Sequence, residues 1–179
     1  MVDLWIEFVK SLIILFPAFA ANAFPPLAKG KRPIDFGKSL FGNRIFGNGK
    51  TIEGFALGTL AGFLVGALET VLYPYLNAYA MEFGVTLPLM TFQIGLLIAV
   101  ATLLGDLAGS FLKRRFGLER GADVLFLDQW NFILMTYVFA VWFIEINLWM
   151  LGLMLITTLI VHRIANIIAH RLKIKKEPW

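Results

Sequence analysis

The segment Gly105–Gln129, GDLAGSFLKRRFGLERGADVLFLDQ, joins two apolar stretches through a basic cluster. An α-helix advances about 100° per residue, so Asp106, Ser110 and Lys113 lie within about 40° of one another on one face. Asp106 lies about 10 Å from Lys113 along the axis. If Lys113 marks a membrane surface, Asp106 lies inside the apolar layer, where a carboxylate is costly and by default indicates function. This segment is the predicted active site.

The composition of the chain indicates a membrane protein. Of its 179 residues, 59% are hydrophobic and 16% are charged, and its mean hydropathy is +0.76, far from the balance of soluble proteins. The length predicts a single domain over residues 1–179. The absence of cysteine excludes disulfides, cysteine metal sites and a thiol nucleophile. The net charge of +4 is typical of bases that flank membrane helices, and we expect no nucleic-acid partner.

Five segments are long and apolar enough to cross a hydrocarbon core, which needs about 20 residues per helix. They are residues 4–24, 52–73, 87–112, 130–146 and 148–169. The predicted fold class is therefore an all-α integral membrane protein with five transmembrane helices. The second segment carries a glycine every four residues from Gly54 to Gly66, and such a smooth face predicts close helix packing.

The basic residues predict the orientation. They gather in two loops, at about residues 25–51 and 113–128, and at the C-terminal end, whereas residues 77–86 and 145–147 contain none. Cytoplasmic loops carry the excess of Lys and Arg. We therefore expect a multi-pass protein of the cell membrane with its N-terminus outside. Both basic loops, the C-terminus and the active site then face the cytoplasm.

The first basic loop reads PPLAKGKRPIDFGKSLFGNRIFGNGKT, with five glycines, six bases and the single acid Asp35. Backbone amides beside basic side chains form a cradle for anions, and the helix that follows favours phosphate at its N-terminus. The loop thus predicts phosphate binding, with a solvated basic linker as the alternative. Its end, Gly49-Lys50-Thr51, resembles a Walker A loop, but Arg44 stands where the first glycine belongs, so a P-loop NTPase is excluded.

The second loop lies between two candidate metal ligands, Asp106 and Asp128. Mg²⁺ is usually held by one or two carboxylates together with substrate phosphates and water. Phosphoryl and nucleotidyl transfer require little covalent catalysis by the protein. They need positioned substrates, a metal ion and cationic side chains, and Lys113 and Arg114 would supply the cations. The alternatives are an intramembrane salt bridge for Asp106 and a helix N-cap for Asp128.

Two further polar residues lie in the apolar segments. Glu69 is deep in the second segment, where an unpaired charge is expensive, so it is protonated, paired or in contact with substrate. Asn22 lies near the cytoplasmic end of the first segment. It either hydrogen-bonds a nucleotide or satisfies the backbone at the helix end.

Both loop motifs resemble the CDP-archaeol synthases, CTP-dependent cytidylyltransferases of archaeal ether-lipid synthesis. The stretches that carry the resemblance are PPLAKGKRPIDFGKSLFGNRIFGNGKTIEG, GDLAGSFLKRRFGLERGADVLFLDQ and the terminal KKEPW. The second stretch is also similar to the signature of phosphatidate cytidylyltransferases. It departs from that signature at Glu119-Arg120, where a Lys-Asp pair is expected, and it lacks the later His-Gly-Gly. The resemblance therefore favours the archaeal branch.

The resemblance implies transfer of CMP from CTP to 2,3-bis-O-(geranylgeranyl)-sn-glycerol 1-phosphate, with Mg²⁺ as cofactor. It implies that Asp106 and Asp128 hold the metal and act with Lys113 and Arg114 as the catalytic set. The residues expected to bind the nucleotide are Asn22, Lys38, Arg44, Gly49, Lys50, Thr51 and Ser110. The partners are then CTP, the diether lipid phosphate and the bilayer. The sequence leaves the oligomeric state open, a homo-oligomer included.

A small anion or metal-ion transporter is the rival interpretation. A transporter would also place carboxylates and glycines within a helical bundle, but its site typically lies near the midplane between repeated helices. This chain shows no internal repeat, and its charges gather at one face. A CDP-alcohol phosphotransferase is a third class, and the closely spaced aspartates of its helix motif are absent.

Overall fold

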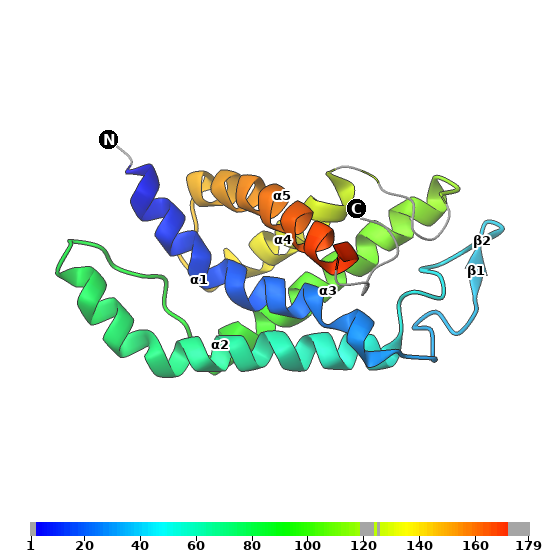
Figure 1. Ribbon diagram of the computed structural model, residues 1–179, viewed down its shortest axis with the longest axis horizontal. Coiled ribbons are helices and arrows are strands. Elements are labelled where there is room, and N and C mark those ends of the chain that lie inside the picture. The colour runs from blue at the N-terminus through cyan, green and yellow to red at the C-terminus, as the bar shows by residue number, and fades with distance from the viewer. Residues whose placement is uncertain (1–2, 119–123, 125, 172–179) are drawn as a thin grey trace.

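The computed structural model describes residues 3–118, 124 and 126–171. Its elements are α1 (Leu4–Ala23), the 3-10 turn η1 (Pro25–Ala28), β1 (Ser39–Leu40), β2 (Asn43–Arg44), α2 (Ile52–Met81), α3 (Phe92–Arg115), α4 (Leu127–Ala140) and α5 (Leu148–Arg171). The helices run back and forth along the long axis, with β1 and β2 at one end (Figure 1). The Glu119-Arg120 pair and the terminal KKEPW, both used in the sequence analysis, lie outside the described residues.

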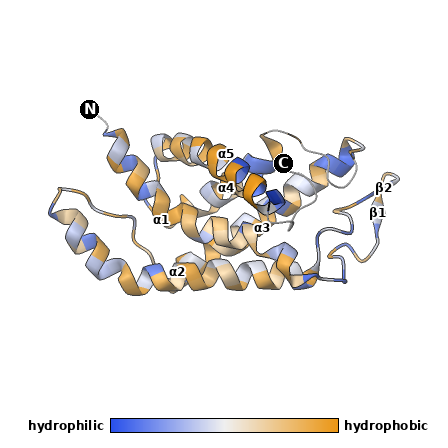
Figure 2. Cartoon of the chain, viewed as in Figure 1, coloured by the Kyte–Doolittle hydropathy of each residue, from blue (hydrophilic) through white to orange (hydrophobic). Residues whose placement is uncertain are grey.

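Four helical stretches of the described chain are long and apolar enough to cross a membrane: Leu4–Ala28, Ile52–Met81, Phe92–Arg115 and Leu148–Ile168. The helices are hydrophobic along their middles, whereas the loop with β1 and β2 and the end of α3 are hydrophilic (Figure 2). The predicted multi-pass membrane protein is therefore confirmed.

Two helix boundaries differ from the predicted segments. Helix α2 continues past Pro74 to Met81, because a proline removes only one backbone donor and the Asn77 side chain beyond it accepts the Leu87 amide at 2.9 Å. Helix α3 begins at Phe92 rather than at residue 87. The hydroxyl of Thr91 accepts the Ile94 amide at 3.2 Å as the N-cap, and Pro88 disfavours helical backbone at the residue before it.

Helix α4 is shorter than the predicted fourth segment. It has 14 residues and ends at Ala140, which corresponds to about 21 Å at 1.5 Å per residue. A tight turn follows, in which the amides of Phe143 and Ile144 donate to the Ala140 carbonyl, each at 2.9 Å. Ile144 and Ile146 are buried, whereas Trp142 and Phe143 are 80% and 63% exposed, so two isoleucines anchor this non-helical segment and the protein covers it only in part.

The glycine face of α2 packs as predicted. A Cβ at Gly58 would lie 2.6 Å from the Ala21 carbonyl oxygen of α1, and one at Gly62 would lie 2.7 Å from Ala99 Cβ of α3. At Gly66 the added Cβ would meet Gly95 Cα at 2.5 Å, backbone against backbone. Small residues let membrane helices approach this closely. The glycines therefore fix how α2 sits against α1 and α3.

The crossing of α2 and α3 gives the first prediction. Gly66→Ala or Gly95→Ala should destabilise the protein by about 1–3 kcal/mol, because a methyl group at this contact forces two backbones apart. Gly152→Ala is the matched control, since no atom lies within 4 Å of its added Cβ. Thermal unfolding in detergent measures the effect, and equal midpoints for Gly66→Ala and Gly152→Ala would contradict it.

Candidate active site

The first basic loop is an ordered structure rather than a linker. Its base is closed by a bridge between Pro33 and Thr51, with the Ile34 amide donating to the Lys50 carbonyl at 2.8 Å and the Ile52 amide to the Arg32 carbonyl at 2.9 Å. Between these ends β1 and β2 form a two-stranded antiparallel hairpin. The loop therefore has a defined fold, although most of its residues are exposed to solvent.

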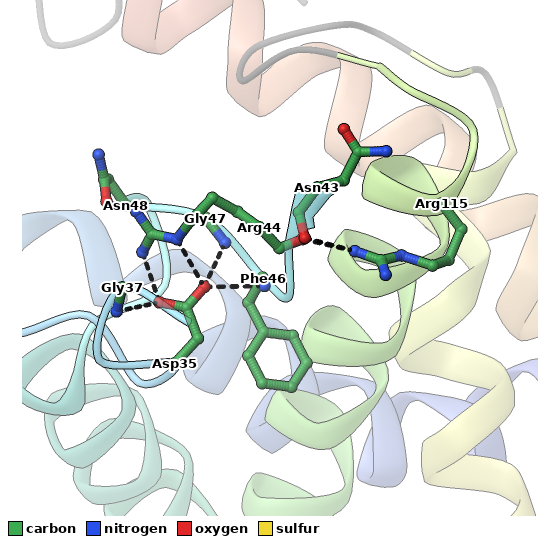
Figure 3. Close-up of polar contacts among 8 residues, drawn as sticks. All are labelled: Asp35, Gly37, Asn43, Arg44, Phe46, Gly47, Asn48 and Arg115. Atoms are coloured by element: carbon green, nitrogen blue, oxygen red, sulfur yellow. Dashed lines mark hydrogen bonds and ion pairs between the residues drawn. The ribbon is translucent and has the colours of Figure 1, made fainter. Parts of the chain in front are cut away.

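The loop folds around the carboxylate of Asp35, whose side chain is fully buried. One oxygen accepts the Gly37 amide at 3.1 Å and Arg44 Nη2 at 2.5 Å. The other accepts Arg44 Nε at 3.3 Å and the amides of Phe46 and Gly47 at 3.0 and 2.9 Å (Figure 3). Burial opposes ionisation, but the guanidinium and the three amides outweigh it and hold the pKa of Asp35 well below its usual range.

The predicted anion cradle thus exists and holds an anion of the protein itself. Arg44, expected to bind nucleotide, forms an ion pair with Asp35 and donates from Nη1 to Asn48 Oδ1 at 2.6 Å. Glycine is required at Gly47, where φ is +88° and an added Cβ would lie 3.1 Å from Arg114 Nε. The loop and the end of α3 are therefore in direct contact at Gly47.

Arg115 docks the hairpin on α3. Its guanidinium donates to the carbonyl oxygens of Leu40, Asn43 and Arg44 and lies 5.0 Å from the ring centroid of Phe111. Figure 3 shows it reaching from α3 toward Asn43. Nothing in the sequence distinguishes Arg115 from its basic neighbours, because flanking charges are common at membrane helix ends.

A cavity of about 240 Å³ lies where the loop meets α3 and α4. Three elements line it with a mixture of charged, polar and aromatic side chains. Its lining residues are Phe46, Gly49, Lys50, Asp106, Ser110, Lys113, Arg114, Asp128 and Asn131. Asp106, Ser110 and Lys113 share one face of α3, as their spacing predicts. The structure therefore brings together both predicted aspartates and three of the five predicted cations, namely Lys50, Lys113 and Arg114.

Two ion pairs cross this cavity. Lys50 Nζ lies 2.5 Å from Asp106 Oδ2 and joins the loop to α3. Lys113 Nζ lies 2.6 Å from Asp128 Oδ2 and joins α3 to α4. The salt bridge considered for Asp106 is thus present, with its partner supplied by the first basic loop. Each carboxylate and each lysine is partly accessible to solvent, so neither pair is sealed.

Asp128 lies inside α4 and is not its N-cap. The helix begins at Leu127, and the Phe126 amide before it donates to Gln129 Oε1 at 2.8 Å. Asp128 instead accepts the Val124 amide at 3.2 Å as well as Lys113. The N-cap alternative is therefore wrong, although a carboxylate in the first turn still interacts favourably with the helix dipole.

The sequence did not indicate Asn131, which lines the cavity one turn after Asp128. Two glycines of α3 make room for it. A Cβ at Gly105 would lie 2.5 Å from the Asn131 carbonyl oxygen, and one at Gly109 would lie 1.5 Å from Asn131 Nδ2. The four-residue spacing of Gly105 and Gly109 is the signal that could have predicted a close crossing with α4 beside Asp106.

Several residues predicted to bind nucleotide do not line this cavity: Asn22, Lys38, Arg44 and Thr51. Thr51 is the N-cap of α2, its hydroxyl accepting the Gly54 amide at 3.1 Å. Glu69 is also remote from the lining, buried in α2 without a hydrogen-bond partner among the described residues. The site is therefore more compact than the predicted set.

The donor set suits Mg²⁺ bound together with a phosphate ligand. Asp106 and Asp128 both line the cavity, and their carboxylates offer the hard oxygen donors that this ion prefers. Within the described part of the chain, no three His, Cys, Asp or Glu side chains gather into a metal site. Mg²⁺ usually completes such a set with phosphate oxygens and water, and the open cavity leaves room for both.

A family model described as CarS-like CDP-archaeol synthase matches residues 1–179. The chain belongs to this family. It is 37% identical over 166 residues to the CDP-archaeol synthase of Pyrococcus furiosus, covering 92% of this chain and 94% of that protein. It is 39% identical over 180 residues to the CDP-archaeol synthase of Methanococcoides burtonii, covering 92% and 100%.

A solved structure agrees with the sequence relatives. It is described as an intramembrane enzyme for archaeal membrane lipid biosynthesis and superposes with a TM-score of 0.75 at 34% identity, covering 89% of this chain and 94% of that one. The resemblance read from the two loop motifs is therefore confirmed, and the comparisons do not favour the transporter interpretation.

Proposed function

We propose that this cavity transfers CMP from CTP to 2,3-bis-O-(geranylgeranyl)-sn-glycerol 1-phosphate, giving the unsaturated CDP-archaeol and diphosphate. The observation that carries the proposal is the convergence of Asp106 and Asp128 with three cations around one cavity at the hydrophilic end of the membrane helices. Membership in the CDP-archaeol synthase family supplies the substrate class.

For this reaction the protein needs mainly to position the two substrates and to stabilise negative charge. An oxygen of the lipid phosphate forms a bond to the α-phosphorus of CTP, while the bond from that phosphorus to the diphosphate oxygen breaks. The lipid phosphate is already ionised, so no general base is needed. Lys50, Lys113 and Arg114 stabilise the negative charge that develops on the phosphoryl oxygens and on the departing diphosphate.

Mg²⁺ fits the two aspartates, where it would neutralise phosphate charge when bound. In the described structure each of these carboxylates is engaged by a lysine. Arrival of the triphosphate offers Lys50 and Lys113 new anionic partners and so frees oxygens of Asp106 and Asp128. We therefore expect the two lysines to exchange their carboxylate partners for phosphate when nucleotide binds. Metal binding to the aspartates is then favoured when nucleotide is present.

The proposed orientation places this cavity on the cytoplasmic face of the cell membrane. The loop with β1 and β2 and the basic end of α3 lie at one end of the molecule, away from the N-terminus, and α5 runs toward that end (Figure 1). Although α4 is short, it and the turn at residues 141–147, which the buried Ile144 and Ile146 anchor, together connect the cavity to the start of α5. We count this composite segment as the fifth crossing, since irregular backbone is tolerated in a membrane where protein buries it. The N-terminus is then outside.

The proposed activity predicts CTP-dependent, Mg²⁺-dependent formation of the CDP-lipid with release of diphosphate. Asp106→Asn and Asp128→Asn should each lower turnover about a hundredfold or more, because a neutral amide binds Mg²⁺ poorly. Asp3→Asn is the matched control, since Asp3 caps the far end of α1 and asparagine caps equally well. Product formation from radiolabelled CTP measures this. Full activity in a folded Asp106→Asn variant would refute the metal assignment, and turnover of phosphatidic acid alone would assign another lipid.

The lysine–aspartate pairs predict that metal binds weakly without nucleotide. Lys50→Met leaves Asp106 without its cation, so Mn²⁺ should bind about tenfold more tightly in the absence of CTP. Lys31→Met is the control, an exposed base of the same loop outside the cavity. Electron paramagnetic resonance of free Mn²⁺ reports this directly. Unchanged or weaker Mn²⁺ binding by Lys50→Met would contradict the exchange of partners.

The orientation is tested by cysteine labelling, because the natural chain contains no cysteine. Glu82→Cys, after the end of α2, should react with a membrane-impermeant maleimide in intact cells. Ser39→Cys, in β1, should react only after the membrane is permeabilised. Both positions are exposed. Reaction of both from outside, or of neither, would rule out the proposed arrangement.

A further inference from the structure

Beyond the residues that line the cavity, we infer that Asp35 and Arg115 are positioning residues for nucleotide transfer: Asp35 folds the loop that carries Lys50, and Arg115 docks that loop on α3. The inference rests on the proposed function and assigns a role to two side chains that lie outside the cavity lining.

Asp35 holds the backbone of the segment that leads to Lys50. Its carboxylate accepts the amides of Phe46 and Gly47. Phe46, Gly49 and Lys50 all line the cavity, so the same short segment has one side on Asp35 and the other on the site. A buried ionised carboxylate is stable only when hydrogen bonds surround it. Asp35 therefore selects one conformation of the segment, the one in which Lys50 reaches Asp106.

Arg115 holds the folded loop in place on α3. Arg115 donates to three carbonyl oxygens of the hairpin, those of Leu40, Asn43 and Arg44. A guanidinium presents several donors in a fixed plane, so it can bridge such a set where a lysine or a neutral side chain cannot. Because Arg115 follows Arg114 and lies two residues after Lys113, docking the hairpin also sets the loop's distance from the cations of α3.

The contacts of Arg44 distinguish a positioning role of Asp35 from direct nucleotide binding. The guanidinium of Arg44 is already bonded to Asp35 and Asn48, and Arg44 does not line the cavity. Even without Arg44, three backbone amides would still surround Asp35. If Asp35 acts by shaping the backbone, its loss is more harmful than the loss of Arg44. If Arg44 binds CTP itself, the order is reversed.

The test uses the full-length protein in detergent with Asp35→Asn, Arg44→Met and Arg115→Met. Asp35→Asn places an amide NH₂ against the donors that surround Asp35. We expect Asp35→Asn and Arg115→Met to raise KM for CTP about tenfold or more, since each breaks hydrogen bonds to a charged group. KM for the lipid phosphate should change less than about threefold by the same scale. Arg44→Met should change KM for CTP less than Asp35→Asn does.

Hydrogen exchange gives a readout that does not depend on turnover. In the unaltered protein the amides of Phe46 and Gly47 should exchange slowly, and in Asp35→Asn they should exchange rapidly while α2 and α3 keep their protection. Asp3→Asn and Arg163→Met are the matched controls for charge loss, both at exposed positions. If Asp35→Asn does not fold, Arg115→Met still tests the docking step, because it leaves the contacts of Asp35 intact.

Two failures can be told apart. If the unaltered protein transfers no CMP from CTP, the proposed function is wrong. If it does, and Asp35→Asn and Arg115→Met keep the normal KM for CTP, the positioning role is refuted. A variant in which KM for CTP and KM for lipid rise together, with loss of protection throughout the helices, would show a merely structural role and also refute it. An Arg44→Met defect in CTP binding larger than that of Asp35→Asn would assign the nucleotide contact to Arg44.

Discussion

The arrangement of the site depends on the need of two carboxylates at a membrane border for cationic partners. An aspartate near the end of an apolar helix is costly unless a cation or ligand compensates its charge. Lys50 compensates Asp106 and draws the first loop onto α3, and Lys113 compensates Asp128 and draws α4 toward the same point. The two ion pairs therefore join three parts of the chain around one cavity, and with Arg114 they leave the lining with one positive charge more than negative.

Glycine packing makes this convergence geometrically available. Gly66 and Gly95 let α2 and α3 touch at the backbone, and Gly105 and Gly109 let α3 lie against α4 at Asn131. Helix α3 is thus closely packed on two sides, and its carboxylate and cations face the remaining opening. Where van der Waals packing drives helix association, as it does in lipid, such close contacts determine the register of the helices. Stability and site geometry depend on the same glycines.

The features that the sequence predicts well are those determined by composition and by helical periodicity. Membrane segments, the glycine face of α2 and the shared helix face of Asp106, Ser110 and Lys113 all follow from one helix considered alone. The features that failed depend on neighbours. Helix α4 ends early because a turn buries Ile144 and Ile146 against the rest of the protein. Asn131 lies in the site only because α3 and α4 cross at two glycines of α3. The sequence pattern of α4 alone does not predict this crossing.

The loop shows most clearly why composition could not assign every basic residue. Glycines and bases beside backbone amides fit an anion, but the pattern is the same whether that anion is a substrate phosphate or an internal carboxylate. The single acid of the loop, Asp35, decides between them: buried and ionised, it must take the nearest guanidinium and amides, which are those of Arg44, Gly37, Phe46 and Gly47. Lys50, beyond the reach of that carboxylate, is left to face Asp106 across the cavity. One buried acid thus separates Arg44, which builds the loop, from Lys50, which faces the proposed nucleotide.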